Sequence, residues 1–354
     1  MKTENTKGFR TDPMLGRRGF LGTAAMGSLV LTVPQMAGAV VRALKKPVKI
    51  GVIADLHQDV MHDGLDRMKA FTMRMSIDKP DAIMQLGDFA YPNMDNREVI
   101  DHFNQAHKQS LHVIGNHDMD AGMTRQNCID VWGMPGRYYV HEVAGIHMLV
   151  LDGNDPGSPT YAGGYAAYVG GEQVKWLKSQ LNAIDGPVIV VSHQPLAGPS
   201  AVDNAEEIQE ILSGAADKVI LAVNGHTHID DVLRVGGVNY LHVNSASYKW
   251  VGGDHRHESY PKSIHENHPW ISCTCPYRDP LFATLTIDPG TSTILVRGAQ
   301  SKWVGDSPEA LGVKLSAGQE NGRQVVPAIR DRRIDNTDRP EKGVDSGGGA
   351  RKAE

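Results

Sequence analysis

Cysteine is scarce in this sequence, with only Cys128, Cys273 and Cys275 among 354 residues. Three cysteines are too few for a disulfide framework, and one Cys-x-Cys pair without a second pair is not a zinc signature. A single bridge from Cys128 to Cys273 or Cys275 is possible in an oxidising compartment, and three free thiols are the alternative.

An excess of basic residues is also missing. The chain has 36 Lys and Arg against 41 Asp and Glu, and its formal net charge of −5 leaves no nucleic-acid-binding footprint. With 40% hydrophobic and 22% charged residues, the composition is typical of a soluble globular protein with a sizeable core. No internal repeat and no linker interrupts residues 47–300, so we expect a single domain there.

The amino terminus lacks an apolar run of about 20 residues, the length that a membrane span needs. The shorter run at residues 23–33 is rich in small residues and follows the pair Arg17 and Arg18, and residues 37–39 offer a small-x-small cleavage site. This order predicts a twin-arginine signal peptide over residues 1–39. We therefore expect the export machinery to deliver the protein to the periplasm, and a membrane anchor is the alternative.

Apolar residues are nearly absent from the other end of the chain. From residue 330 the sequence is first charged and then rich in Gly, with little surface to bury. Such a composition predicts a disordered tail over residues 330–354.

What the sequence does contain is a regular alternation of short apolar runs and amphipathic segments. Runs at 49–54, 82–86 and 111–114 have the length of buried strands, and residues 64–79 and 98–110 have helical spacing. Further along we expect strands at 147–151, 187–191 and 218–223, a helix at 170–183, and a β-rich section at 238–243 and 282–296. This pattern predicts an α/β fold.

Five of these predicted strands end in side chains that can bind a metal ion. In chain order they are Asp55 and His57, Asp88, then Asn116, His117 and Asp118, then His193, and finally His226 and His228. Functional side chains of α/β proteins lie at the carboxyl ends of strands. Each group alone fits an ordinary turn, but the ordered set of five does not. Gly87 and Gly225 stand before two of them, where the backbone can turn sharply.

The residue types indicate the chemistry. Hydrolysis of a phosphate ester needs a nucleophile, relief of charge on the phosphoryl oxygens and a proton for the leaving group. Two metal ions about 3.5–4 Å apart can supply the first two by clamping the phosphate and lowering the pKa of a bound water. Mixed imidazole and carboxylate ligands suit Fe, Mn, Zn or Co better than Ca or Mg. A bridging carboxylate must contact both ions, and Asp88 is the candidate.

This ordered set resembles the calcineurin-like metallophosphoesterases. Their pattern is Asp-x-His, Gly-Asp, Gly-Asn-His-Asp/Glu, a lone His and then Gly-His-x-His, and all of it occurs here in order. The Gly-x-Glu-x-x-x-Trp-Leu helix that opens at Gly170 is similar to the bacterial cyclic-nucleotide phosphodiesterase and acid phosphatase branches. The resemblance covers residues 47–300. It implies a four-layer α/β/β/α sandwich with a dinuclear centre between two sheets.

The resemblance also implies roles for individual residues. Asp55, His57 and His228 would bind one metal ion, Asn116, His193 and His226 the other, with Asp88 bridging and His117 as general acid. The implied cofactor is a pair of divalent or trivalent transition metal ions, Fe, Mn or Zn, and the implied partner is a small-molecule phosphate ester.

The implied reaction is hydrolysis of a phosphate mono- or diester, with a 3',5'-cyclic nucleotide as one candidate substrate. A phosphomonoesterase, such as an acid or alkaline phosphatase or a nucleotidase, is the alternative. A non-catalytic metal-binding scaffold is the alternative from another class of protein. Its mark would be the loss of ligands, and none is lost here.

Two features depart from the patterns of individual branches of the family. Tyr91 follows Gly87-Asp88 at the spacing of the iron-binding Tyr of purple acid phosphatases. That branch, however, has Gly at the position of His57. We therefore expect the Tyr91 side chain to pack in the core rather than to bind a metal ion. In the Ser/Thr phosphatase branch, the position of Tyr91 holds an Asp that supports the catalytic His. That Asp is missing here, so Asp118 is the candidate to orient His117.

Residues 254–275 hold four histidines. They form either a further metal site or, as we expect, a solvated insert that shapes substrate choice.

Overall fold

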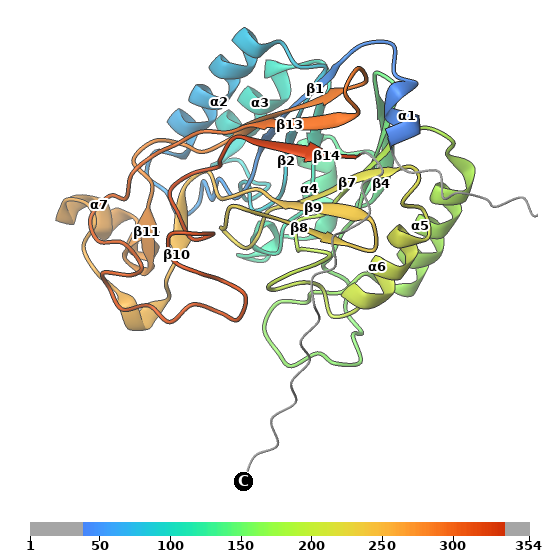
Figure 1. Ribbon diagram of the computed structural model, residues 1–354. Helices are drawn as coiled ribbons and strands as arrows, with labels where there is room; N and C mark the ends of the chain where they lie inside the picture. The colour runs from blue at the N-terminus through green and yellow to red at the C-terminus, as the bar shows by residue number, and fades with distance from the viewer. Residues whose placement is uncertain (1–37, 337–354) are drawn as a thin grey trace, which may run out of the picture. The chain divides into compact units, whose positions relative to one another are not determined.

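The computed structural model describes residues 38–336 (Figure 1). Arg17, Arg18 and the rest of the predicted signal up to residue 37 lie outside the described residues, as do residues 337–354. No helix among the described residues is long and apolar enough to cross a membrane.

Two six-stranded mixed sheets form the centre of the fold. The first has the order β14-β13-β12-β1-β2-β3. Its strands are β1 (Val48–Ile53), β2 (Ala82–Gln85), β3 (Ser110–His112), β12 (Ala283–Asp288), β13 (Thr293–Arg297) and β14 (Arg332–Asp335). The second has the order β4-β5-β6-β7-β9-β8. Its strands are β4 (Tyr139–Val143), β5 (Ile146–Val150), β6 (Val188–Val191), β7 (Val219–Asn224), β8 (Asp231–Val235) and β9 (Val238–His242).

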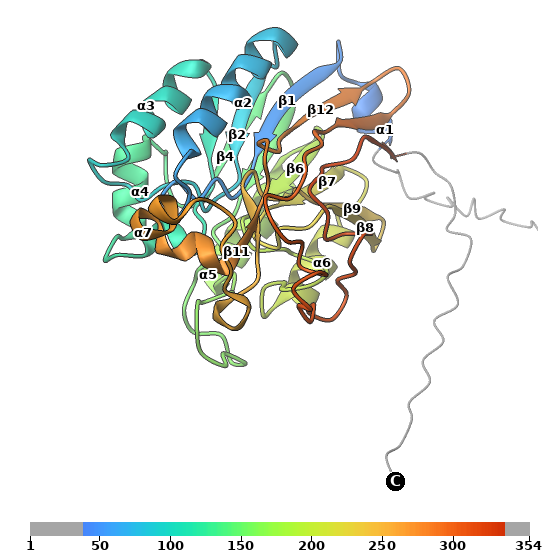
Figure 2. The ribbon, with the colours of Figure 1, turned by 90° about the vertical axis from the view of Figure 1, so that its left-hand side faces the viewer.

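Helices cover the outer faces of both sheets (Figures 1 and 2). Helices α2 (Gly64–Asp78) and α3 (Arg97–Ala106) lie against the first sheet, and α5 (Gly171–Ala183) and α6 (Ala205–Ser213) lie against the second. Two further helices are α1 (Gly38–Arg42) and α4 (Arg125–Trp132), the latter between β3 and β4 in the chain. The predicted four-layer α/β/β/α sandwich is confirmed.

The helices bury one face each because their apolar residues recur every three or four positions. In α2 these are Met68, Phe71 and Met75, which belong to a hydrophobic cluster shared with both sheets. In α5, Leu177 and Leu181 belong to a second cluster between the second sheet and its helices. Burial on both faces explains why the central strands are continuous apolar runs rather than alternating ones.

Within each sheet, the strands that precede the ligand candidates run parallel to one another. Strand β1 pairs in parallel with β2, and β2 with β3, while β5, β6 and β7 are parallel in the second sheet. Parallel strands present their carboxyl ends at one edge of a sheet, so the loops that follow them lie together there.

Strand β14 corrects the boundary expected at the end of the chain. It pairs with β13 from Thr293–Asp335 to Val296–Arg332. The prediction of a disordered tail from residue 330 is therefore wrong for residues 330–336, and the sheet extends beyond the domain end expected at residue 300. The short run around Ile334, which is buried, was too small a signal among charged residues.

A separate two-stranded sheet carries the histidine-rich insert. It pairs β10 (Tyr248–Trp250) with β11 (Thr274–Pro276), and between them lie η2 (Gly253–His255), α7 (Lys262–Asn267) and η3 (Pro269–Cys273). The imidazole of His265 accepts hydrogen bonds from the backbone N–H groups of Ser259 and Tyr260, 3.1 Å each. None of the insert's histidines belongs to a candidate metal group within residues 38–336. The cysteines at 128, 273 and 275 are buried free thiols.

Candidate metal centre

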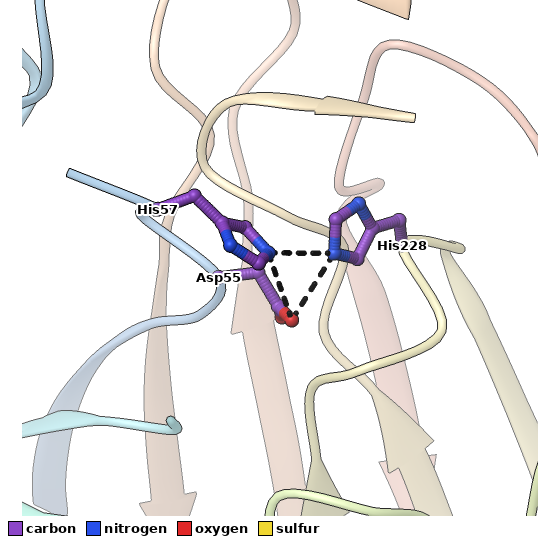
Figure 3. Close-up of side chains that lie close together, drawn as sticks. All are labelled: Asp55, His57 and His228. Atoms are coloured by element: carbon purple, nitrogen blue, oxygen red, sulfur yellow. Dashed lines mark hydrogen bonds and ion pairs between the residues drawn. The ribbon is translucent and has the colours of Figure 1, made fainter. Parts of the chain in front are cut away.

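The first group of ligand candidates joins the ends of β1 and β7. Asp55 and His57 follow β1, and His228 follows β7. The Nε2 atom of His228 lies 3.2 Å from Asp55 Oδ1 and 3.2 Å from Nε2 of His57. Figure 3 shows the three side chains directed at one point between them.

The second group joins loops from both sheets in the same way. Asp88 follows β2, His193 follows β6 and His226 follows β7. Nε2 of His193 lies 3.1 Å from Asp88 Oδ2 and 3.2 Å from Nδ1 of His226. Within the described residues, these two groups are the ones whose ligand atoms lie close enough to hold an ion.

Asp88 lies where the two groups meet. Its Oδ2 atom is 3.1 Å from His193 in the second group and 3.7 Å from Nε2 of His57 in the first. Its Oδ1 atom accepts a hydrogen bond from the backbone N–H of His117 at 2.8 Å. One oxygen is therefore held by the backbone while the other faces both groups.

A buried atom without a partner indicates a further ligand. The side chain of Asn116 is buried, and its Oδ1 atom has no hydrogen-bond partner among the described residues. Buried polar atoms are normally paired, so an orphaned one calls for an ion or a water. Asn116 is the residue that the sequence assigned to the second ion together with His193 and His226.

The outer nitrogens of two histidines orient them for metal binding. Nδ1 of His193 donates to the carbonyl oxygen of Leu86 at 2.8 Å, and Nδ1 of His228 donates to that of Tyr248 at 2.7 Å. A carbonyl oxygen can only accept, so Nε2 of each neutral ring carries the lone pair. Metal-bound histidines characteristically make this second contact, which fixes the tautomer and the ring plane. The donor set therefore fits transition metal ions.

The backbone at these residues is in a conformation that side chains disfavour. Asp55, His57, Asp88, His226 and His228 all have positive φ, between 47° and 67°. A non-glycine residue in the left-handed region is uncommon, and such residues cluster at functional sites where the surrounding structure holds them. Half of the non-glycine residues with positive φ in the described chain are ligand candidates.

Two glycines allow the ligand loops to approach one another. A Cβ atom on Gly87, which has a φ of 95°, would lie 2.4 Å from Nδ1 of His193. A Cβ atom on Gly225 would lie 2.5 Å from Oδ2 of Asp55. Both contacts are closer than atoms can approach, so a side chain at either position would push a ligand out of place.

A model of the calcineurin-like phosphoesterase family matches residues 48–230, which span all the ligand candidates. The chain belongs to that family. It is therefore a metal-dependent phosphoester hydrolase, and the two residue groups are the candidate sites for the two ions of this dinuclear family.

Solved structures show the same fold at low sequence identity. A dimetal phosphatase from Danio rerio has 14% identity and a TM-score of 0.51, over 73% of this chain and 98% of that chain. GAP50, the anchor in the inner membrane complex of Plasmodium, has 14% identity and a TM-score of 0.51, over 82% of this chain and 89% of that chain. A comparison with curated protein sequences gave no match.

His117 lies beside the first group, in the wall of the cleft into which the metal groups open. It opens the 3-10 turn η1 (His117–Met119), and its ring centre lies 5.5 Å from that of His57. Its Nδ1 donates to Oδ2 of Asp120 at 2.8 Å. Burial lowers the pKa of this imidazole, but the negative charges of Asp88 and Asp120 outweigh it and raise the pKa above its usual value.

Asp120 and Tyr165 are contacts of His117 that the sequence analysis missed. The Tyr165 hydroxyl donates to both carboxylate oxygens of Asp120, at 2.8 and 2.9 Å. Side chains three residues apart eclipse one another in a 3-10 helix, so a predicted 3-10 turn at His117 would have pointed to Asp120. Tyr165 comes from the long segment between β5 and α5, and no local pattern marks it.

Asp118, the residue expected to orient His117, has another role. Its carboxylate is buried and accepts hydrogen bonds from the backbone N–H groups of Asp88, Phe89 and Gly115, at 2.7 to 2.8 Å. Burial and the nearby charge of Asp88 raise its pKa above the usual value, while the hydrogen bonds from Gly115 and Phe89 act in the opposite direction. Asp118 thus ties the loop after β2 to the loop after β3, and the expectation that it supports His117 is wrong.

We expect Asp120→Asn to lower kcat by about 10- to 100-fold, part of the contribution that a positioned general acid makes. The amide removes the charge that holds His117, while the metal ligands stay intact. The measurement is kcat on an alkyl and an aryl phosphate ester together with metal content. Asp101→Asn, which removes an exposed ion pair with Arg97 on α3, is the matched control. An equal loss in both variants would contradict a positioning role for Asp120.

The metal groups open into a cleft of about 870 Å³. Tyr91 lies half-buried in its wall rather than in the core, so the expected core packing of this residue is wrong. Burial and the neighbouring Asp59 raise the pKa of the Tyr91 phenol to about 12. The phenol therefore stays protonated at neutral pH.

A buried lysine supports the loop between the two ligands after β7. Nζ of Lys249 donates to the carbonyl oxygen of Thr227 at 3.0 Å and to Oε1 of Gln319 at 3.3 Å. Burial lowers its pKa to about 8, with Asp55 acting in the opposite direction. Because Thr227 lies between His226 and His228, Lys249 links the candidate ligands to the segment around Gln319 that lines the cleft.

Proposed function

We propose that this phosphoesterase hydrolyses small phosphate mono- or diesters at the two metal groups, with His117 as the general acid. The observation that carries the proposal is the position of His117. Its ring lies in the cleft wall next to His57, and Asp120 engages Nδ1, which leaves Nε2 for the leaving-group oxygen.

The residues of the chain would have separate roles in metal binding and proton transfer. Asp55, His57 and His228 would hold one ion, Asn116, His193 and His226 would hold the other, and Asp88, which lies between the two groups, would serve both. When bound, the two ions neutralise charge on the phosphoryl oxygens and supply the water nucleophile. Asp120 keeps the proton on Nδ1 of His117, so that Nε2 can donate its own proton as the ester bond breaks.

The ligand set alone does not divide monoesters from diesters, because these residues face the phosphoryl group that both share. A 3',5'-cyclic nucleotide is the diester that we place first in the substrate panel, and nucleoside and sugar monophosphates represent the phosphomonoesterase alternative. The protein is stripped of metal and reconstituted with Mn, Zn or Fe, and hydrolysis is measured across the panel. We expect activity that depends on added metal, and an active metal-free protein would overturn the proposal.

We also propose that the protein is exported through the twin-arginine route to the periplasm. Support comes from Arg17 and Arg18 before the mildly apolar run at residues 23–33. Replacing both arginines with Lys should leave nearly all precursor in the cytoplasm, as measured by cell fractionation and immunoblotting. Arg10→Lys, outside the pair, is the control and should be exported. Continued export of the double variant would contradict the proposal.

A further inference from the structure

Two indole rings stand at the outer part of the cleft. Trp250 ends β10 and Trp270 lies in η3, with exposed fractions of 45% and 55%, and both side chains line the cleft. Tryptophan is usually well buried, so two exposed indoles in one cleft wall point to a ligand. We call this pair the indole platform.

The indole platform is connected to the metal centre by a row of aromatic rings. The Tyr248 ring stacks on His57, with centres 4.9 Å apart and an angle of 26° between planes. The Trp250 ring centre lies 6.4 Å from that of Tyr248 and 6.4 Å from that of Trp270. These separations lie within the range of about 4.5–7 Å for aromatic pairs in direct contact. Trp250 is therefore two ring-to-ring steps from the candidate metal ligand His57, and Trp270 is three.

The two indoles form one surface rather than a slot. Because their rings already contact each other at an angle of 40°, a third ring has no room between them and must stack on an outer face. The insert holds the rings in place. Trp250 pairs with Thr274 across β10 and β11, and the guanidinium carbon of Arg256 lies 5.8 Å from the Trp270 ring centre.

The rest of the cleft lining holds both apolar and polar side chains, Ser316 and Gln319 among the polar ones. Val251, Val313 and Leu315 line the cleft beside the platform, with Lys314 as an exposed cation among them. The platform itself offers flat π faces, and each indole has a single N–H as its hydrogen-bonding group. The platform therefore suits a planar aromatic ring better than an aliphatic polyol, because stacking needs only a flat π face on the ligand.

We propose that the indole platform binds a planar aromatic ring, a nucleobase or an aryl group, in the organic part of the substrate while the phosphoryl group occupies the metal centre. This inference rests on the proposed hydrolysis and names the class of ester. Trp250 and Trp270 are thereby specificity-determining residues, supplied by the histidine-rich insert.

The test uses two pairs of esters that differ in the ring. AMP is compared with ribose 5-phosphate, and phenyl phosphate with cyclohexyl phosphate, on the full-length metal-loaded enzyme. KM is measured where an ester is turned over, and Kd from quenching of tryptophan fluorescence where it is not. We expect the ring-bearing member to bind about 5- to 100-fold more tightly, in line with stacking on one aromatic side chain. A preference in the AMP pair alone identifies a nucleobase, and a preference in both pairs identifies any planar ring.

Variants connect the preference to the platform. Trp250→Ala and Trp270→Ala, alone and combined, should bring the ring-bearing ester to the affinity of its ring-free partner, whereas Trp250→Phe should keep most of the preference. Trp176→Ala is the matched control, because Trp176 packs on Tyr138 at α5, away from the cleft lining. Near-UV circular dichroism checks that each variant is folded.

Three results would overturn the inference: equal affinity within both pairs, a preference that survives the double variant, or the same loss in Trp176→Ala. Failure of the proposed function is a separate result. If no ester is hydrolysed with any metal, the reaction is wrong, and a fluorescence preference for AMP over ribose 5-phosphate would still support the platform.

Discussion

Asp88→Asn is expected to lose both metal ions and to lower kcat/KM by about 10³-fold or more, since the bound ions supply several kcal/mol of transition-state stabilisation. The physical reason is the position of Oδ2, which faces His193 at 3.1 Å and His57 at 3.7 Å. The amide keeps an oxygen that can still accept from the backbone N–H of His117, so the loop should keep its shape. Elemental analysis of protein purified without chelator, together with kinetics, makes the measurement.

The comparison with other ligand variants gives this result its meaning. His57→Ala and Asn116→Ala each remove a proposed ligand of a single ion, so each variant should lose mainly that ion. Asp88→Ala should also lose more metal than either of them. A chain that keeps two ions after the loss of Asp88 would show that this residue does not bridge.

His117→Ala is expected to keep both ions but to lose about 10²- to 10⁴-fold in rate on an alkyl or ribose phosphate, the usual contribution of general acid catalysis. The loss should be much smaller on p-nitrophenyl phosphate, because that leaving group departs without a proton. His117 is positioned for this role by Asp120 and lies outside both candidate metal groups. The measurement is kcat on both esters, with metal content determined in the same preparation.

Each deviation from this pattern has its own meaning. An equal loss on both esters would indicate that His117 contacts the phosphate rather than the leaving group. Loss of metal would make His117 a ligand. His107→Ala, which removes a half-buried histidine at the end of α3, controls for unspecific effects of losing an imidazole.

The sandwich and the site-forming loops could be predicted because both depend on short-range patterns. Buried parallel strands are continuous apolar runs, and Asp55, Asp88 and His193 each follow such a run within a few residues. Shared strand direction brings the loops of each sheet to one edge, and the packing of the two sheets brings these edges together. The strand predicted at 111–114 is the shorter strand β3, which begins one residue earlier and ends two residues earlier (Ser110–His112).

Other features depend on contacts between distant segments and could not be predicted this way. Tyr165 reaches Asp120 across 45 residues, and Trp250 reaches Trp270 only after the insert folds back. Strand β14 is recognisable only by its pairing with β13. Asp118 illustrates a different difficulty. Its position next to His117 suggested a contact with that imidazole, but its carboxylate accepts hydrogen bonds from backbone N–H groups instead.

The left-handed backbone at Asp55, His57, Asp88, His226 and His228 also affects the stability of the ligand loops. Holding a side chain there costs on the order of 1 kcal/mol or more per residue, and a glycine would relieve that strain. All five positions nevertheless carry aspartate or histidine in this chain, so the strained backbone coincides with the side chains that can bind the metal ions. These loops are therefore less stable than glycine would make them, and the stability is lost where the ligand candidates are placed.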